Sequence, residues 1–368
     1  MPSFAMGDAM DRRDFIKLSF YGASLAAACA APALASLIPP HFTYCVVAIG
    51  VQVTEFRDGK PSNSKWVAIG TGFFYGHLSK PDPDLTKRLY DVYLVTAKHV
   101  LDGWKAQRVA AAANGMLVSD LMVRVNPIDV TTPATDIAVR EFADKDTDWT
   151  ANPNGKDVAV ISCDFEILRK RAFGVNFFAG DEMAADIARL SQLKVEAGDG
   201  VFVLGFPMSL IEEWRNVVIV KGGTIARIED LLISRSDAFL IDALVFPGNS
   251  GGPVVLRPEL ASIQGTPPQT RSYLIGMVVS YQPYTDTAVS QQTQRPRVTF
   301  EENSGLATVL PTDYVVAAIV LDKKMHPPKE PPAMPPPQAT PSPQVTPPAA
   351  SSSPQVTPTP APSVKSTP

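Results

Sequence analysis

Cysteine and histidine are scarce in this sequence, which limits the metal sites that it can build. Its 368 residues include three cysteines, Cys29, Cys45 and Cys163, and four histidines. No cysteine belongs to a C-x-x-C pair or stands at a Cys/His spacing typical of zinc sites, so we expect no bound metal. Cys45 and Cys163 are candidates for a disulfide in an oxidising compartment. The strong tendency of free cysteines to be buried favours two separate buried thiols.

Charge is also low, at 19% of residues against a usual quarter. The deficit lies in long terminal segments that carry few charged residues. The formal net charge is -4, and no basic stripe runs along the chain. The composition therefore excludes a typical nucleic-acid-binding surface, and we expect no nucleic-acid partner.

A hydrophobic run of clear membrane-spanning length is missing. Residues 18–34 form a mildly apolar run that Pro32 interrupts, which is marginal for about 30 Å of hydrocarbon. Charged residues 11–17 precede this run, and the small-residue pattern Ala33-Leu34-Ala35 follows. This order predicts an export signal over residues 1–35.

The charged part of the signal reads Arg12-Arg13-Asp14-Phe15-Ile16-Lys17. It resembles a twin-arginine signal, which implies folding before export to the periplasm or the extracellular space. Two alternatives remain open: a membrane anchor, and lipid attachment at Cys29, since residues 25–29 faintly resemble a lipobox.

Proline is concentrated at the other end of the chain. Residues 326–368 hold 16 of the 35 prolines, and Ser-Pro-Gln-Val-Thr-Pro occurs twice there. This composition cannot build a core, so we expect an extended, disordered tail. The tail is a spacer in the simpler interpretation, and a contact to the cell envelope or wall in the alternative.

Between these termini the pattern is of short apolar strands separated by turn-rich loops. Residues 44–53, 65–74 and 90–96 are the first three such runs, and few long helical periods follow. This spacing predicts an all-β barrel or sandwich.

A serine framed by glycines is the most informative motif. Residues 246–253 read Phe-Pro-Gly-Asn-Ser-Gly-Gly-Pro. Glycines permit unusual backbone conformations and close approach, so this segment is suited to exposing the Ser250 hydroxyl. A serine nucleophile needs a base that a third group orients. Among the histidines, only His99, directly after the apolar run 90–96, has a suitable context for that base.

The segments Leu94–Val100, Asp-x-Ala-Val and Gly248–Pro253, in this order, resemble the trypsin/chymotrypsin-like serine peptidases, most closely the bacterial members. The resemblance covers roughly residues 42–322, within a domain at 36–325. It implies two six-stranded antiparallel barrels that meet near residues 170–200, a short closing helix, and an active site between the barrels. It also implies that the N–H groups of Gly248 and Ser250 form an oxyanion hole.

Two aspartates fit the third position of the triad. Asp136 precedes Ile-Ala-Val and then charged residues, whereas Asp157 precedes the continuous apolar run Val-Ala-Val-Ile. The role requires a carboxylate beside the imidazole at the start of a buried strand, which favours Asp157. Asp136 is then expected in a turn or at the start of a strand in the preceding hairpin.

The glycine-framed serine also occurs in the α/β-hydrolases, a rival class of enzyme. That fold places its histidine after the serine. Only His326, beside Pro327 and Pro328, follows Ser250, so the chain order favours the peptidase.

By the same resemblance, the primary specificity pocket is lined by Leu244, Ser280, Tyr281 and Gln282. Leu244 stands where an enzyme specific for basic residues carries an aspartate, so we expect a preference for small or apolar residues. Residues 283–304 are unusually polar, and we expect a long loop there.

Asn249 stands where zymogen-type members carry an aspartate that pairs with a freed amino terminus. We therefore expect a site that forms without proteolytic activation.

Together these features predict an exported serine endopeptidase acting on protein or peptide substrates, without a cofactor. A catalytically silent, protease-like binding module of the cell envelope is the alternative. The oligomeric state is left open.

Overall fold

The structure is a computed structural model that describes residues 37–144, 149–259 and 268–327. The described residues belong to one compact unit, which ends at Pro327. The predicted export signal, with Cys29, lies outside the described residues, as does the predicted tail beyond Pro327.

The first half of the described chain is a nine-stranded sheet in the order β6-β5-β1-β2-β3-β8-β7, with β4 paired to β1 and β9 to β2. Within the described residues no strand pairing closes this sheet into a barrel. The first half therefore differs from the predicted six-stranded barrel both in its number of strands and in its closure. Three of its strands have only two or three residues, too few to show an alternating pattern. The strands are β1 (Val46–Arg57), β2 (Lys60–Lys80), β3 (Leu89–Thr96), β4 (Met116–Val118), β5 (Met122–Val125), β6 (Thr135–Ala138), β7 (Thr150–Ala151), β8 (Ala159–Cys163) and β9 (Phe178–Ala179).

The second half is a closed six-stranded barrel in the order β10-β11-β12-β15-β14-β13, with every pair antiparallel. The sequence-based prediction is confirmed for this half. Alternating valine, isoleucine and leucine side chains of these strands are buried in its core. The strands are β10 (Gly200–Gly205), β11 (Ile219–Arg227), β12 (Phe239–Asp242), β13 (Pro253–Leu256), β14 (Leu274–Val289) and β15 (Pro296–Pro311).

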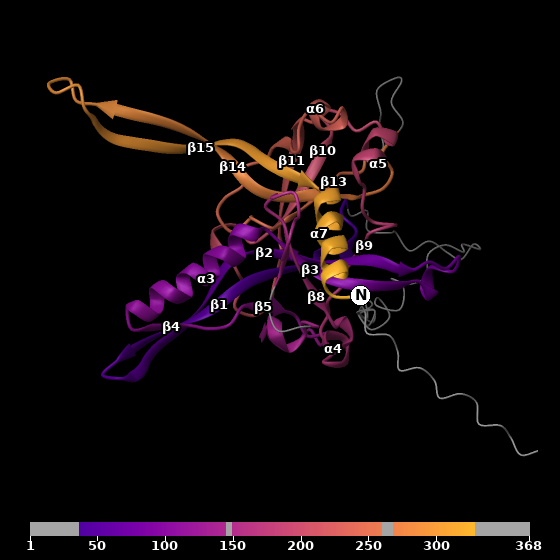
Figure 1. The fold of residues 1–368 in the computed structure, drawn as a ribbon, viewed down its shortest axis with the longest axis horizontal. Coiled ribbons are helices and arrows are strands. Elements are labelled where there is room, and N and C mark those ends of the chain that lie inside the picture. The colour runs from indigo at the N-terminus through magenta and orange to yellow at the C-terminus, as the bar shows by residue number, and fades with distance from the viewer. Residues whose placement is uncertain (1–36, 145–148, 260–267, 328–368) are drawn as a thin grey trace, which may run out of the picture. The chain divides into compact units, whose positions relative to one another are not determined.

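The segment 283–304, predicted to be a loop, is mostly strand. β14 and β15 stay paired out to Val289 and Pro296 and form a hairpin that extends away from the barrel (Figure 1). Phe300 and Val298 are about half exposed on this hairpin. The prediction was wrong because the outer hairpin has no buried face, and therefore lacks the alternation of apolar and polar residues that marks a strand.

Helices connect and close the two halves. The longest helix in the described residues is α3 (Lys98–Ala113), which follows β3 directly. The predicted closing helix is α7 (Thr312–Met325), with Pro311 as its N-cap residue, and it buries Val315, Ala318 and Ile319. The shorter helices are α2 (Pro40–Thr43), η1 (Leu85–Lys87), η2 (Val139–Glu141), α4 (Phe165–Lys170), α5 (Ile187–Gln192), η3 (Pro207–Ser209) and α6 (Glu229–Leu232).

Cys45 and Cys163 are separate, buried thiols, as the burial argument predicted. Burial raises the pKa of both thiols well above the ordinary value, which keeps them protonated and unreactive.

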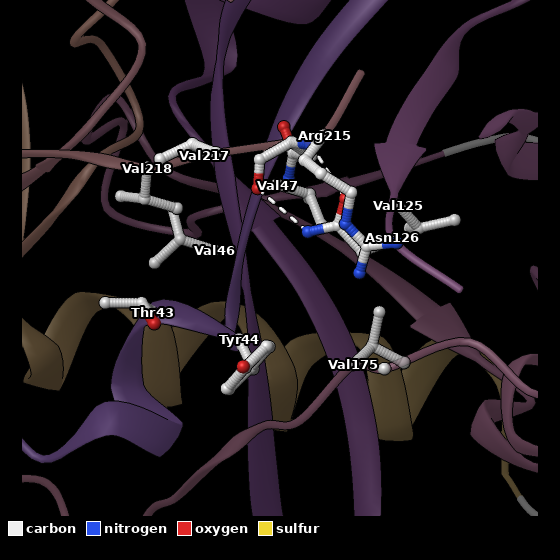
Figure 2. A pocket seen from close by; sticks show the side chains of 12 residues that line it. Thr43, Tyr44, Val46, Val47, Val125, Asn126, Val175, Arg215, Val217 and Val218 are labelled. Atoms are coloured by element: carbon white, nitrogen blue, oxygen red, sulfur yellow. Dashed lines mark hydrogen bonds between the residues drawn. The ribbon is translucent and has the colours of Figure 1, made fainter. Parts of the chain in front are cut away.

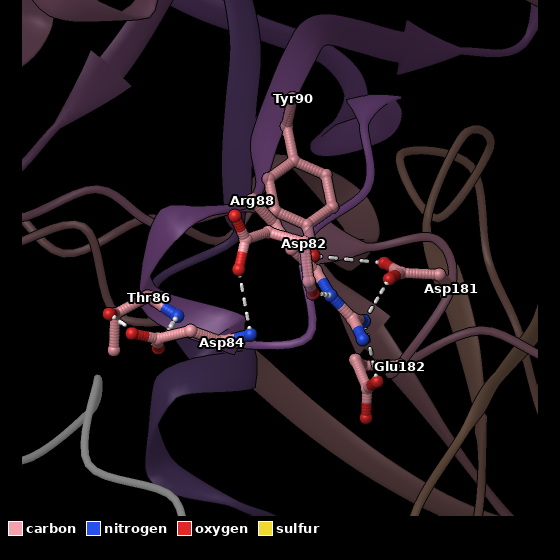
Figure 3. A network of polar contacts seen from close by, with 7 residues as sticks. All are labelled: Asp82, Asp84, Thr86, Arg88, Tyr90, Asp181 and Glu182. Atoms are coloured by element: carbon pink, nitrogen blue, oxygen red, sulfur yellow. Dashed lines mark hydrogen bonds and ion pairs between the residues drawn. The ribbon is translucent and has the colours of Figure 1, made fainter.

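A polar network links the β2–β3 turn to the chain that leads into the second barrel (Figure 3). The Arg88 guanidinium donates to Asp181 (2.5 Å), Glu182 (2.8 Å) and the Asp82 carbonyl (2.9 Å). The Tyr90 hydroxyl also donates to Asp181 (3.0 Å). A planar guanidinium that joins three acceptors fixes the relative positions of these segments.

The core of the first half gives a direct test of the fold. Phe74 is fully buried, and its ring packs against the rings of Phe142 and Phe165. We expect Phe74→Ala to lower the free energy of unfolding by about 3–5 kcal/mol, because it leaves a cavity. The matched control is Phe300→Ala on the exposed hairpin, with an expected change within about 0.5 kcal/mol. Urea denaturation measures both, and equal losses would contradict the described packing.

Candidate active site

His99 lies in the first turn of α3. β3 ends at Thr96, and Ala97 is in an extended conformation before α3 begins at Lys98. The backbone N–H groups of a first helical turn lack partners within the helix. The structure therefore presents the His99 side chain and an N–H group in need of an acceptor at the same place.

Asp157 supplies that acceptor. In the pairing of β3 with β8, Thr96 faces Ala159, so the chain just beyond β3 lies next to the chain just before β8. Asp157 Oδ1 accepts the His99 backbone N–H (2.9 Å), and Asp157 Oδ2 lies 2.6 Å from His99 Nδ1. The carboxylate thus holds both the ring and the helix end.

The environment of Asp157 favours its ionised form. Burial raises its pKa, but hydrogen bonds from the His99 side chain and backbone outweigh burial, so the pKa lies below the ordinary value. An ionised Asp157 requires Nδ1 to carry a proton when the two share a hydrogen bond, which leaves Nε2 as the basic nitrogen of a neutral ring.

Asp136, the other candidate, lies elsewhere. It is the second residue of β6, and both of its carboxylate oxygens accept from Arg124 Nη1 (3.1 and 3.2 Å). Burial raises the Asp136 pKa. The structure therefore brings Asp157, and not Asp136, to His99.

Ser250 lies in the loop between β12 and β13, and this loop packs against the chain that leads to His99. A Cβ atom on Gly251 would come within 2.1 Å of the Thr71 carbonyl oxygen and 2.4 Å of Thr96 Oγ1. Gly251 also has φ +85°, a left-handed conformation. A glycine is required here because any side chain would push the serine loop away from the end of β3.

The backbone of the serine loop is fixed by its carbonyl groups. Met208 N–H donates to Pro247 O (2.6 Å), and Gly252 N–H donates to Asn249 O (2.8 Å). Thr71 holds the other two carbonyls: its hydroxyl donates to Gly248 O (2.7 Å) and its N–H to Ser250 O (3.0 Å).

Within residues 247–250 of this loop, two N–H groups have no protein acceptor in the described chain, those of Gly248 and Ser250. The carbonyl and N–H of one trans peptide point in opposite directions. The bonds to Pro247 O and Asn249 O therefore direct these two N–H groups away from the loop's own contacts. They are the two donors that the sequence predicted for an oxyanion hole.

The donor to Pro247 comes from a strained turn. Met208 and Ser209 have φ of +54° and +56°, which is unusual for residues with a side chain. Such strain persists only where the surroundings impose it, and here Ser209 Oγ is tied to the Ala68 carbonyl of β2 (2.7 Å). Neither Thr71 nor Met208 was assigned a role from the sequence. The glycines that flank Thr71 were the available signal.

Asn249 stabilises the loop from inside. It is buried at 1% exposure, its Oδ1 accepts the Phe246 N–H (3.0 Å), and its own N–H donates to Phe246 O (2.9 Å). Zymogen-type peptidases carry an aspartate at the position of Asn249. In this chain the neutral hydrogen bonds of Asn249 to Phe246 hold the loop at that position.

The reacting groups are accessible. The His99 side chain is 50% exposed, and Ser250 is partly buried. Within the described residues, Ser250 Oγ donates no hydrogen bond, to His99 Nε2 or to any other acceptor. Catalytic hydrogen bonds are often long in the absence of substrate and shorten when it binds.

The predicted pocket residues lie on the second barrel. Leu244 follows β12 and is 48% exposed, while Ser280, Tyr281 and Gln282 lie in β14. Tyr281 donates to Glu301 (2.8 Å) and Gln282 to Thr308 (2.9 Å), both in β15. These bonds fix the two longest of the predicted pocket side chains against the neighbouring strand.

A cavity of about 310 Å³ lies elsewhere, and neither the triad residues nor the predicted pocket residues line it (Figure 2). Valine side chains line it together with Arg215, Asn126 and Asn216. The Arg215 guanidinium is engaged by the carbonyls of Pro127, Asp129 and Thr132. The described residues also include no cluster of three or more His, Cys, Asp or Glu side chains suited to a metal ion.

Comparison with known proteins identifies the family of this chain. A profile described as the trypsin-like peptidase domain matches residues 70–259, slightly more than half of the chain, and includes His99, Asp157 and Ser250. No curated protein sequence matches the chain.

Two solved structures show a distant similarity. One is an inactive form of Rv3671c from M. tuberculosis H37Rv carrying a serine-to-alanine mutation, with 15% identity, a TM-score of 0.33, and coverage of 82% of this chain and 99% of that one. The other is an inactive form of the Rv3671c protease, with 16% identity, a TM-score of 0.31, and coverage of 76% and 89%. The assignment rests on the domain match: the chain belongs to the trypsin-like peptidase domain family, and its function is of the serine-protease type.

Proposed function

We propose that this protein is an exported serine endopeptidase in which Ser250 attacks the peptide carbonyl, His99 transfers the proton, and Asp157 orients His99. The observation that carries the proposal is the serine loop. The four carbonyls from Pro247 to Ser250 are hydrogen-bonded, and among the N–H groups of these four described residues those of Gly248 and Ser250 are left to bind an oxyanion.

The first step places negative charge on the carbonyl oxygen as Ser250 Oγ forms its bond to the carbonyl carbon. Two N–H groups that are already directed stabilise this charge without reorganising, which is the main source of their effect. His99 Nε2 takes the proton from Ser250 and returns it to the leaving amine.

Asp157 stabilises the imidazolium that forms between these two transfers. Its two bonds to His99, one to the ring and one to the backbone, fix the ring orientation and the tautomer. When the tetrahedral intermediate collapses, the C–N bond breaks, the protonated amine leaves and an acyl-enzyme remains on Ser250. Water then hydrolyses the acyl-enzyme by the same sequence of proton transfers.

Leu244 supports a pocket for small or apolar side chains. It is an exposed, uncharged residue at the entrance of the serine loop, so a basic substrate side chain finds no carboxylate partner there. A lysine or arginine would lose hydration without compensation.

The function is tested through Ser250. We expect the mature protein to be labelled by a fluorophosphonate probe, and Ser250→Ala to lose this labelling and about a million-fold in kcat. Products from a peptide mixture should show cleavage after small or apolar residues, and not after lysine or arginine. A folded, unlabelled wild-type protein, under conditions where a related peptidase is labelled, would support the silent binding module instead.

The two aspartates provide a matched pair of variants. Asp157→Asn should lower kcat about ten-thousand-fold, because the amide favours the wrong tautomer of His99. Asp136→Asn should leave kcat near that of the wild type, since Asp136 contacts Arg124 rather than His99. Equal kcat losses in both variants would contradict the assignment of Asp157.

Acid unfolding of the same two variants provides a control. The Asp157 pKa is lowered, so its stabilising contribution is present above the ordinary aspartate pKa of about 3.9 and is lost as the pH falls below it. The stability advantage of the wild type over Asp157→Asn should therefore shrink below about pH 4. The Asp136 pKa is raised, so protonation of this group stabilises the folded protein. The stability of the wild type relative to Asp136→Asn should therefore increase as the pH falls.

The proposal of export rests on residues 11–35, with Arg12-Arg13 as the twin-arginine pair. Among the described residues, no helix has the length and hydrophobicity needed to cross a membrane. Replacing both arginines by lysine should retain the protein, folded and uncleaved, inside a bacterial host. Cell fractionation measures this, and unchanged export of the double variant would contradict the twin-arginine route.

A further inference from the structure

Thr71 lies at the contact between the two halves of the described chain, and all of its polar groups are engaged there. It is fully buried in β2 of the first sheet. Its hydroxyl donates to Gly248 O (2.7 Å) and accepts from Phe206 N–H (3.1 Å). Its backbone N–H donates to Ser250 O (3.0 Å), and its carbonyl accepts from Thr96 Oγ1 (2.8 Å).

These four bonds join three segments of the site. Thr96 ends the strand that leads to His99, Phe206 begins the turn whose Met208 holds Pro247, and Gly248 and Ser250 bear the two unpaired N–H groups. The Thr71 hydroxyl by itself links two of these segments, because it accepts from the Phe206 N–H and donates to Gly248 O.

We propose that the Thr71 hydroxyl is a positioning group for the oxyanion hole. Through the Phe206 N–H it anchors the turn whose Met208 N–H holds Pro247 O, the carbonyl of the peptide that bears the Gly248 N–H. Through Gly248 O it fixes the next peptide of the loop, so that the Gly248 N–H stays directed outward. This proposal rests on the proposed peptidase function and adds to it a residue that contacts neither substrate nor reacting atoms.

The packing around the hydroxyl supports this role. A Cβ atom on Gly205 would lie 2.8 Å from Thr71 Oγ1, and one on Gly251 would lie 2.1 Å from the Thr71 carbonyl. Two glycines are therefore needed for the second barrel to approach this side chain. Removing the hydroxyl would leave the Gly248 carbonyl and the Phe206 N–H unpaired in a buried place, and the backbone would have to shift to satisfy them.

The test compares Thr71→Val, which keeps the shape and removes the hydroxyl, with Thr71→Ser, which keeps the hydroxyl. The matched control is Thr150→Val. Thr150 is also buried, and its hydroxyl donates to Asp322 (2.7 Å), a residue of α7. Steady-state kinetics on a peptide substrate, affinity for a peptide boronate and melting temperature are measured for each variant.

We expect Thr71→Val to lower kcat by about 10- to 100-fold, the scale of a small displacement of a catalytic group, while KM changes little. Boronate affinity should fall in parallel with kcat, because the boronate mimics the tetrahedral transition state. Thr71→Ser, which keeps the hydroxyl, should retain the kcat and the boronate affinity of the wild type. Thr150→Val should lower the melting temperature without changing kcat.

Two results would overturn the proposal: a folded Thr71→Val variant with wild-type kcat and boronate affinity, or a Thr150→Val variant that loses kcat to the same extent. If Thr71→Val does not fold, Thr71→Cys decides, since a thiol is a weak donor of nearly the right size, and wild-type kcat in that variant overturns the proposal. Failure of the peptidase function itself is a separate outcome, because the wild-type protein would then neither react with the fluorophosphonate nor cleave peptide.

Discussion

The hydrogen bonds to the carbonyls of residues 247–250 are the constraint on which the site depends. A glycine-rich loop around a serine can adopt many conformations, because glycine is permissive in its backbone angles. Here every carbonyl of the segment has a donor, and two of the four donors belong to Thr71 in the other half of the chain. The bonds to Pro247 O and Asn249 O direct the Gly248 and Ser250 N–H groups outward, and the two bonds from Thr71 hold the peptides that follow each of them. A site whose dipoles are already oriented need not reorganise as charge develops.

The same constraint explains the residues that have no chemistry of their own. Gly251 allows the loop to touch the end of β3, and Gly205 allows β10 to approach Thr71. The strained turn at Met208 and Ser209 keeps a donor on Pro247. Because Asn249 closes the loop through neutral hydrogen bonds to Phe246, the formed loop does not depend on a charged partner.

The sequence predicted the parts of the site that are marked by local pattern. Ser250 and His99 stand in recognisable segments, and the apolar run after Asp157 reflects the burial of β8. The bonds of Thr71 and Met208 join residues more than a hundred positions apart or depend on backbone conformation, so no local pattern shows them.

The parts of the fold that were predicted wrongly lack a local pattern for similar reasons. Strands of two or three residues, such as β7 and β9, are set by pairing with neighbours rather than by their own composition. The outer β14–β15 hairpin was predicted to be a loop because neither of its faces is buried. The second barrel, whose strands do bury one face, was predicted correctly.

The most direct measurement is a crystal structure of the mature protein with a peptide boronate that carries a small apolar residue next to boron. The account predicts a covalent bond from boron to Ser250 Oγ, with a boronate oxygen about 2.7–3.1 Å from both the Gly248 and Ser250 nitrogens. A boronate that bonds to Ser250 while its oxygens point away from these nitrogens, or one that does not bond to Ser250, would contradict the account.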